Sequence, residues 1–197
     1  MVEHVILRWL APVIRPCARP LYQGPGHDGG MGPILFLDVD GVFIPYDRAE
    51  AVPDSATVAL TGPDPDEELL ARIDPRHGPR LQALGCELVW ATGWEDEAND
   101  EISPRLGLPE LPVLAWTLGD IGRPEPSGLH WKTRDIVEIA VGRPFVWVDD
   151  EIGPVDRDWV AAHHPAPALL RRVDPRIGLT AADIDEIEAW LADLGEA

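Results

Sequence analysis

The sequence predicts an α/β fold, a three-layer sandwich in which helices cover both faces of a mostly parallel sheet. Short, continuously apolar runs, such as residues 34–37, alternate along the chain with patterns typical of helices. Three of these runs end directly in a polar residue, at Asp38, Thr92 and Asp149. Strands that alternate with helices form βαβ units, so a parallel sheet is expected.

The expected strands are short, and most are bounded by glycine, proline or acidic residues. They cover residues 34–38, 86–91, 112–116, 145–148 and 168–173. A turn rich in glycine, proline and aspartate separates residues 57–60 from residues 69–73, and these two arms are predicted to pair as a small hairpin.

The expected helices lie between the strands and at the C-terminus. They cover residues 75–84, 95–106, 132–141 and a C-terminal segment. Asp74 is the expected cap of the first helix, and Pro104 favours an early end of the second. Thr180 opens the last helix, whose 3/4-spaced apolar stripe consists of Ile184, Ile187, Leu191 and Leu194.

The composition excludes several classes of protein. An apolar content of 45% excludes a disordered chain, and two cysteines cannot form a disulfide framework or a metal cluster. With 35 acidic against 16 basic residues, the net charge of −19 disfavours long nucleic acid as a partner, although a local basic pocket could still hold one phosphate. No apolar run reaches the ~18 residues of a membrane span, so we expect a cytoplasmic protein. No histidine has a partner at metal-ligand spacing, and we expect a surface position for His27, His163 and His164.

Residues 1–30 differ from the rest of the chain because their second half is rich in proline and glycine. We expect them to be a leader or a disordered N-terminal extension, and residues 31–197 to form a single domain. Residues 24–29 match the pattern G-x-G-x-x-G of dinucleotide-binding loops. The match precedes the first strand and contains Pro25, so it does not predict a dinucleotide site.

The sharpest chemical feature is the pair of carboxylates that follows the first strand. Residues two apart on an extended segment point the same way, so Asp38 and Asp40 can face one reaction centre. Gly41 then permits a tight turn. Two such carboxylates can act as nucleophile and as general acid and base, and their repulsion requires a cation such as Mg²⁺. Each strand-end acid could instead cap the turn that follows it.

Four motifs in order carry a resemblance to a known family. They are Asp38-Val-Asp-Gly-Val42, Trp90-Ala-Thr-Gly93, Lys132 in His130-Trp-Lys, and Val146-Trp-Val-Asp-Asp-Glu151. With these motifs, residues 33–151 resemble the haloacid dehalogenase-like (HAD) superfamily of hydrolases. The sequence around the tryptophans of these motifs resembles HAD-domain proteins of actinobacterial type. The resemblance implies a HAD-like Rossmannoid fold. The intervals between the motifs predict a short flap over about residues 43–73 and no large cap domain.

The resemblance also implies a role for each motif residue in a Mg²⁺-dependent phosphohydrolase. Asp38 would attack phosphorus to form an aspartyl-phosphate, and Asp40 would protonate the leaving oxygen and later activate water. Thr92, Gly93 and Lys132 would bind the phosphoryl group. An acid at position 40 favours phosphate esters over haloacids as substrates, because a halide leaves unprotonated. A solvated surface lysine is the alternative for Lys132.

The implied Mg²⁺ ligands are Asp38, the backbone carbonyl of Asp40, and Asp149, with Asp150 acting through water or a hydrogen bond. Asp150 and Glu151 could instead cap the following turn, and Glu151 is the weaker metal candidate because neighbouring residues of a strand point apart.

The substrate expected from this reading is a phosphorylated small molecule, such as a nucleotide or a phosphosugar. Trp94 and Trp131 flank the motifs and are candidate substrate contacts, although core packing, which we expect for Trp90 and Trp147, would also explain them. A phosphatase that acts on a protein or on a nucleic-acid end is a rival. A catalytically weak or inactive HAD-fold regulatory protein that binds phosphate or metal is the non-enzymatic alternative.

Overall fold

The computed structural model describes residues 32–46, 65–116 and 125–195, and their central element is a parallel sheet. The sheet has four strands in the order β2-β1-β3-β4, and every neighbouring pair is parallel. The predicted α/β class and parallel sheet are thereby confirmed. In chain order the elements are β1 (Ile34–Leu37), α2 (Pro65–Leu70), α3 (His77–Ala83), β2 (Glu87–Trp90), the π-helical turn η2 (Ala98–Ile102), α4 (Ser103–Leu106), α5 (Thr133–Ala140), β3 (Phe145–Asp149), α6 (Pro154–His163), β4 (Ala168–Arg172) and α7 (Ala181–Gly195).

Strand β1 lies inside the sheet, and its four residues divide between two cores. Its alternating side chains point to opposite faces: Leu35 and Leu37 join one apolar cluster, whereas Ile34 and Phe36 join the other. All four side chains are buried, which explains why the sequence of this strand is continuously apolar and does not alternate between apolar and polar residues.

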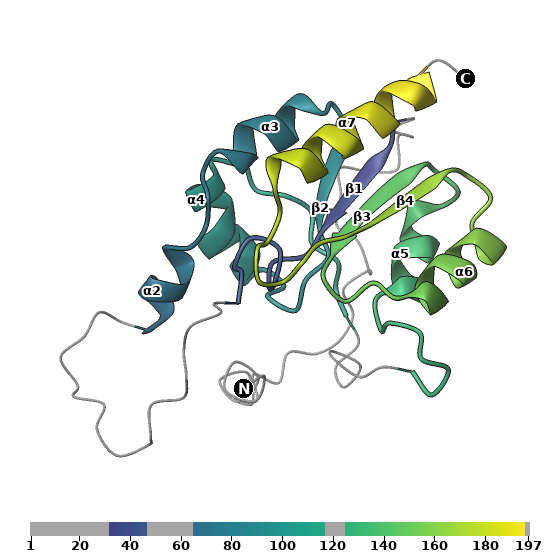
Figure 1. Ribbon diagram of the computed structural model, residues 1–197, viewed down its shortest axis with the longest axis horizontal. Coiled ribbons are helices and arrows are strands. Elements are labelled where there is room, and N and C mark those ends of the chain that lie inside the picture. Colours follow the sequence, from purple (N-terminus) through teal and green to yellow (C-terminus); the bar gives the residue numbers. More distant parts are fainter. Residues whose placement is uncertain (1–31, 47–64, 117–124, 196–197) are drawn as a thin grey trace.

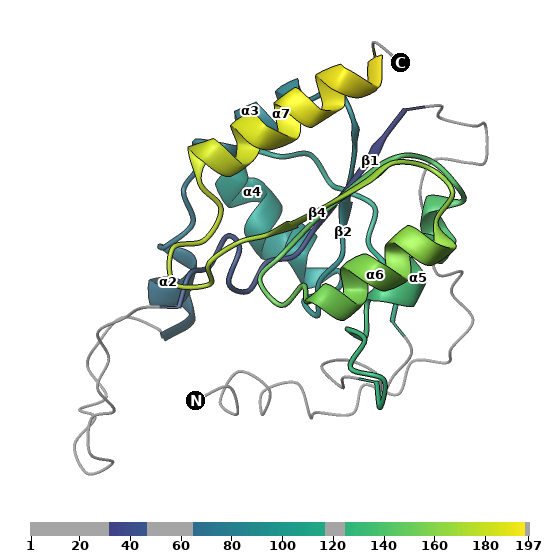
Figure 2. The ribbon, with the colours of Figure 1, turned by 45° about the vertical axis from the view of Figure 1, so that its right-hand side comes forward.

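Helices cover both faces of the sheet, as the three-layer prediction requires (Figures 1 and 2). On one face, α3 contributes Leu81 and α7 contributes Ile184 and Ile187 to the core. On the other face, Ile136 of α5 and Val160 of α6 pack against the sheet. No large cap domain is present among the described residues, and none of their helices is long and apolar enough to cross a membrane.

The predicted hairpin is wrong in its second arm. Residues 69–73 were expected to be extended, but Leu69 and Leu70 belong to helix α2. Pro65 at the first helical position and acidic residues in the first turn favour a helix at this point. The first arm, residues 57–60, lies outside the described residues, as do most of the expected flap and residues 1–30.

The expected third strand, residues 112–116, is reduced to a single parallel bridge between Trp90 and Val113. Its backbone still follows the edge of β2, because Trp90 N donates to Pro112 O and Leu114 N donates to Trp90 O, both at 2.9 Å. Before this bridge, the backbone of Leu111 is hydrogen-bonded to the side chain of Asn99 instead of to a strand: Asn99 Nδ2 donates to Leu111 O, and Leu111 N donates to Asn99 Oδ1.

The helix predictions are confirmed in place, with three corrections. The residue that precedes α3 at its N-cap is Arg76 rather than Asp74, and Asp74 Oδ1 instead accepts a bond from Arg76 N at 2.9 Å in the turn before the helix. Pro104 stands in the first turn of α4 rather than ending a helix. Helix α6 was not predicted, and the expectation of a surface position for His164, which follows it, is wrong. His164 is buried, and its Nε2 lies 2.9 Å from Arg143 O. His163 is exposed as expected, whereas His27 lies outside the described residues.

Thr180 caps α7 as predicted, in a reciprocal arrangement with Asp183. Thr180 N donates to Asp183 Oδ2 at 2.7 Å, and Asp183 N donates to Thr180 Oγ1 at 3.3 Å. Burial alone would raise the pKa of Asp183, but hydrogen bonds from Thr180 and Arg171 outweigh it and hold that pKa below its usual value. The charged cap therefore fixes the start of the helix against the sheet edge formed by β4.

Glycine at position 78 is required by the packing of α3. A Cβ there would lie 1.7 Å from Leu106 O, at the end of α4, so alanine must push the two helices apart. We expect Gly78→Ala to lower the free energy of unfolding by about 1–3 kcal/mol, measured by urea denaturation. Gly195→Ala is the matched control, because a Cβ at position 195 meets no atom within 4 Å. An equal loss in both variants would contradict this packing.

Candidate functional site

The site is built around an ammonium group that lies between two carboxylates. Lys132 Nζ lies 2.8 Å from Asp38 Oδ2 and 2.8 Å from Asp149 Oδ2. Asp38 follows β1 and Asp149 ends β3, and these neighbouring parallel strands bring both acids to the same edge of the sheet. The lysine side chain is 3% exposed, so it is not the solvated surface lysine that the sequence also allowed. It is also the single lysine of the chain.

The protonation of these three groups follows from burial and from their mutual charges. Burial would lower the pKa of Lys132, but Asp149 and Asp38 outweigh it and raise that pKa, so the ammonium stays charged. Burial would raise the pKa of Asp149, but Lys132 and His130 hold it below its usual value. Asp38 keeps a pKa well above its usual range because burial, Asp149 and Asp40 together outweigh Lys132. One ammonium therefore does not balance the acids around it.

Asp150 completes the acidic cluster, and Gly41 makes room for it. A Cβ at Gly41 would lie 2.6 Å from Asp150 Cγ, and the φ of +67° at Gly41 is one that glycine adopts at no cost. Burial, Asp149 and Glu151 raise the pKa of Asp150 to about 7. The turn glycine predicted from the sequence therefore has a second role, because it allows the backbone to approach this carboxylate.

The carboxylates of Asp38, Asp149 and Asp150 form a donor set that fits Mg²⁺. Each offers an oxygen, and these atoms all lie within 4.8 Å of one another. Buried carboxylates are the hard oxygen ligands that Mg²⁺ takes, and the raised pKa values of Asp38 and Asp150 reflect a surplus of negative charge that a divalent cation would offset. The side chain of Asp40 is not in this set, and the predicted contribution of its backbone carbonyl stays a prediction.

Asp40 and Thr92 are held by the residues that follow β2. Trp94 Nε1 donates to Asp40 Oδ2 at 3.1 Å, and Trp94 N donates to Thr92 Oγ1 at 3.3 Å. Burial raises the pKa of Asp40, and the bond from Trp94 offsets this only in part. Trp116 Nε1 fixes the backbone by donating to Thr92 O at 2.8 Å. Trp94 thus orients the predicted acid, whereas its contact with a substrate stays a prediction.

Lys132 is positioned by a buried network that sequence reasoning missed. Asp156 Oδ1 accepts bonds from His130 N at 2.8 Å and from Thr133 Oγ1 at 2.7 Å, and Asp156 Oδ2 accepts from Gly153 N at 2.7 Å. One buried carboxylate therefore ties the turn that carries Lys132 to the segment after β3. The bond to Gly153 is local, three residues away, but the contacts that reach the lysine turn join Asp156 to residues 26 and 23 positions away, and no local pattern marks them.

His130 lies beside the lysine and links it to Glu151. Lys132 N donates to His130 Nδ1 at 3.2 Å, and His130 Nε2 lies 3.1 Å from Glu151 Oε2. The hydrogen bond from His130 holds the pKa of Glu151 below its usual value despite partial burial. The Glu151 side chain is 67% exposed and lies outside the three-carboxylate set, in agreement with its weaker standing as a metal candidate.

Comparison with protein families gives one decisive match. Residues 34–184 match the model of a family described as the HAD domain in Swiss Army Knife RNA repair proteins. The chain belongs to this family. Searches among curated proteins and among solved structures gave no match.

Most of the residues that were predicted from the sequence to form the site lie close together in the HAD domain. Asp38, Asp149, Asp150 and Lys132 meet at one end of the sheet, and Asp40 joins them through its charge. Thr92 is buried two residues after the end of β2, and Trp90 and Trp147 belong to the core as expected. Gly93 directly follows Thr92, and its role in phosphate binding stays a prediction.

Two aromatic residues border the HAD site. Trp131 packs edge-on against Trp116, and Lys132 Nζ lies 5.3 Å from the centre of its indole ring. Tyr46, which sequence reasoning missed, is 46% exposed, and burial together with Asp40 and Asp150 raises its pKa. Its phenol therefore lies within electrostatic reach of the acids. The only sequence signal for it is its position shortly after the Asp-x-Asp-Gly motif.

Replacing Gly41 by alanine is expected to weaken Mg²⁺ binding about tenfold or more, because the new Cβ displaces the carboxylate of Asp150. The measurement is the gain in unfolding free energy on addition of Mg²⁺. Gly128→Ala is the matched control: its φ of +81° imposes a comparable backbone cost of about 1–2 kcal/mol, but its nearest atom lies 4.0 Å away. Equal Mg²⁺ stabilisation of the two variants would show that Asp150 does not take part.

Proposed function

We propose that the protein is a Mg²⁺-dependent phosphomonoesterase that works through an aspartyl-phosphate on Asp38. The observation that carries the proposal is the Lys132 ammonium, bonded at 2.8 Å to both Asp38 and Asp149 beside a third buried carboxylate. Such concentrated opposite charges stabilise a phosphoryl group in transfer, whose chemistry depends mainly on positioning and electrostatics. Membership of a HAD family supports a hydrolase in general.

In the first step, a carboxylate oxygen of Asp38 attacks phosphorus and forms an O–P bond while the bond from phosphorus to the leaving oxygen breaks. The leaving oxygen takes its proton from Asp40. Burial raises the pKa of Asp40, and a raised pKa favours the protonated form that an acid catalyst needs. The bond from Trp94 Nε1 to Asp40 Oδ2 leaves the other carboxyl oxygen to carry that proton.

In the second step, Asp40 is a carboxylate and acts as a base. It takes a proton from a water molecule, whose oxygen attacks phosphorus, and the bond between phosphorus and Asp38 breaks to release inorganic phosphate. Asp38 returns as a carboxylate, paired again with Lys132. Charge and atoms balance over the two steps, with one water consumed for each phosphate released.

Mg²⁺ would be held by Asp38, Asp149 and Asp150, and when bound it supplies a positive charge that offsets the phosphoryl oxygens. The Thr92 hydroxyl accepts a bond from Trp94 N, which leaves its own proton to donate to a phosphoryl oxygen. Gly93 would add a backbone N–H. Trp94 and Trp131 would border the leaving group of a nucleotide or phosphosugar substrate.

A phosphate at a nucleic-acid end is the second candidate substrate, because the matched family is described from RNA repair proteins. The net charge of −19 disfavours long nucleic acid but allows an end to enter. The two candidate substrates are distinguished by comparing kcat/KM for a mononucleotide with kcat/KM for a short oligonucleotide that carries the same terminal phosphate.

The test is a panel of phosphomonoesters with Mg²⁺, run on the native chain and on Asp38→Asn and Asp40→Asn. We expect Asp38→Asn to lose turnover and to form no phosphoenzyme. Asp40→Asn should lose about 10²–10⁴-fold in turnover on alkyl phosphates. On an aryl phosphate, whose leaving group needs no proton, the same variant should accumulate phosphoenzyme, because only the second step still needs the base.

The control is Asp158→Asn, which changes an exposed acid on α6 and should leave turnover unchanged. Turnover that survives Asp38→Asn would refute the covalent route. A native chain that binds Mg²⁺ and phosphate but turns over no substrate would instead favour the non-enzymatic HAD-fold protein.

A further inference from the structure

A cavity of about 520 Å³ lies on the side of the sheet covered by α3 and α7, apart from the acidic cluster. Its apolar walls are the turn after Asp40, through Val42 and Phe43, and the adjoining segment with Ile177 and Leu179. Phe43 N is bonded to Val39 O at 2.8 Å, and Leu179 N to Val42 O at 2.8 Å, so both apolar walls are tied to the fold. None of the carboxylates assigned to the reaction lines this cavity.

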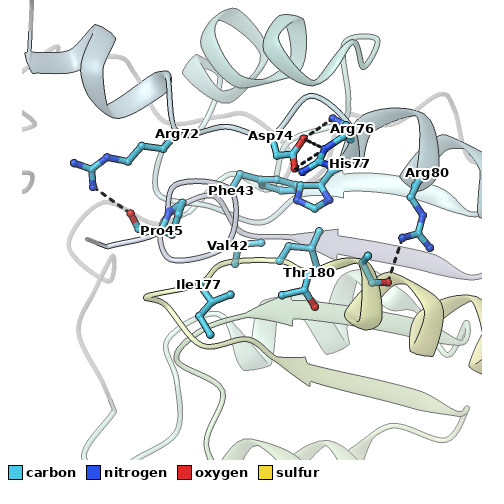
Figure 3. Close-up of a pocket in the computed structure, with 12 residues that line it drawn as sticks. Val42, Phe43, Pro45, Arg72, Asp74, Arg76, His77, Arg80, Ile177 and Thr180 are labelled. Carbon is cyan, nitrogen blue, oxygen red and sulfur yellow. Dashed lines mark hydrogen bonds and ion pairs between the residues drawn. The ribbon is translucent and has the colours of Figure 1, made fainter. Parts of the chain in front are cut away.

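The polar border of the cavity is basic in an otherwise strongly acidic chain. Arg72, Arg76 and Arg80 recur at every fourth residue, and all three line the cavity together with His77. Among the described residues, the lining contains one acid, Asp74. Figure 3 shows Arg72 at one end, Arg80 at the other, and His77 with the Asp74–Arg76 pair between them.

The guanidinium groups keep donors free for a ligand. Arg72 Nη1 donates to Pro45 O at 3.2 Å, and Arg80 Nη1 donates to Ala181 O at 3.2 Å, each bond using one of five N–H groups. Arg80 also pairs with Asp185, whose side chain is 68% exposed. Arg76 offsets the charge of Asp74 through a forked pair, so this acid does not repel an anion as a free carboxylate would.

We propose that this cavity binds a nucleotide-type ligand that carries two or more phosphate groups in a row. Arginine forks are the donors that match phosphate oxygens, and their spread along the cavity suits several phosphates rather than one. The apolar walls offer a surface for a base or sugar, and the volume is that of a small-molecule site. A nucleoside triphosphate and a short single strand share this chemistry. The proposal stands independently of the phosphatase activity proposed above.

The test is isothermal titration of the full chain in EDTA with three probes: inorganic tripolyphosphate, a nucleoside triphosphate and a six-nucleotide single strand. Arg72→Gln and Arg80→Gln should each weaken binding of the preferred probe about tenfold, and the double variant should abolish it. Binding should weaken with added salt and persist in Asp38→Asn. The probe that binds more tightly identifies the source of the phosphates.

The matched control is Arg176→Gln. Arg176 pairs with Asp174 in the same Asp-Pro-Arg arrangement as Arg76 with Asp74 but does not line the cavity, and its loss should leave binding unchanged. A shift of the His77 ring signals on titration of the unmodified chain provides a readout that does not depend on the folding of any variant. The proposal would be overturned if no probe binds, or if binding is unchanged in the arginine variants and leaves the His77 signals unshifted. Neither result would bear on the phosphatase activity, which the phosphomonoester panel tests separately.

Discussion

The bond of one buried ammonium to two buried carboxylates is the interaction on which the rest of the site depends. Lys132 reaches Asp38 and Asp149 at 2.8 Å each, and all three side chains are nearly closed to solvent. Burying charge is costly unless it is paired, and removal of one partner of a buried pair typically costs about 3–5 kcal/mol. Further acids nearby, Asp40 and Asp150, add negative charge that the single ammonium cannot balance. This imbalance is the physical reason to expect a divalent cation here.

The parallel sheet creates the conditions for this arrangement. Neighbouring parallel strands end at one edge, so residues that directly follow β1 and β3 become neighbours although they are far apart in sequence. Lys132 lies at the start of α5 and is not part of the sheet, so the pairing of the strands does not determine its position and other contacts must do so. Asp156 does so by joining the turn before α5 to the turn after β3. Fold and site are therefore linked through a residue that needs no contact with a substrate.

Sequence reasoning located the parts of the site that follow from a local pattern. Asp38, Thr92 and Asp149 were predicted because each ends an apolar run, and Lys132 because of its motif context. The bond from Trp94 to Asp40 and the network of Asp156 were missed, since they join segments 54 and 26 residues apart. The arm at residues 69–73 was predicted as extended because Leu69, Leu70 and Ile73 cluster there, a pattern that a short helix satisfies equally well. A short apolar run is compatible with a strand and with a short helix, and tertiary packing determines which of them forms.

The most direct measurement of the central interaction uses the fact that Lys132 is the single lysine of the chain. Protein labelled with ¹³C only at lysine gives one Cε signal, whose position reports the protonation of Nζ. A buried ammonium paired with Asp149 and Asp38 has a raised pKa, so its stabilising effect is complete below the ordinary lysine value and is lost only as pH rises through the raised one. We predict that the signal stays that of a charged ammonium beyond pH ~10.4, the ordinary lysine pKa, in the folded protein. Titration at or below that value would show that the ammonium is not held between the two carboxylates and would contradict the account.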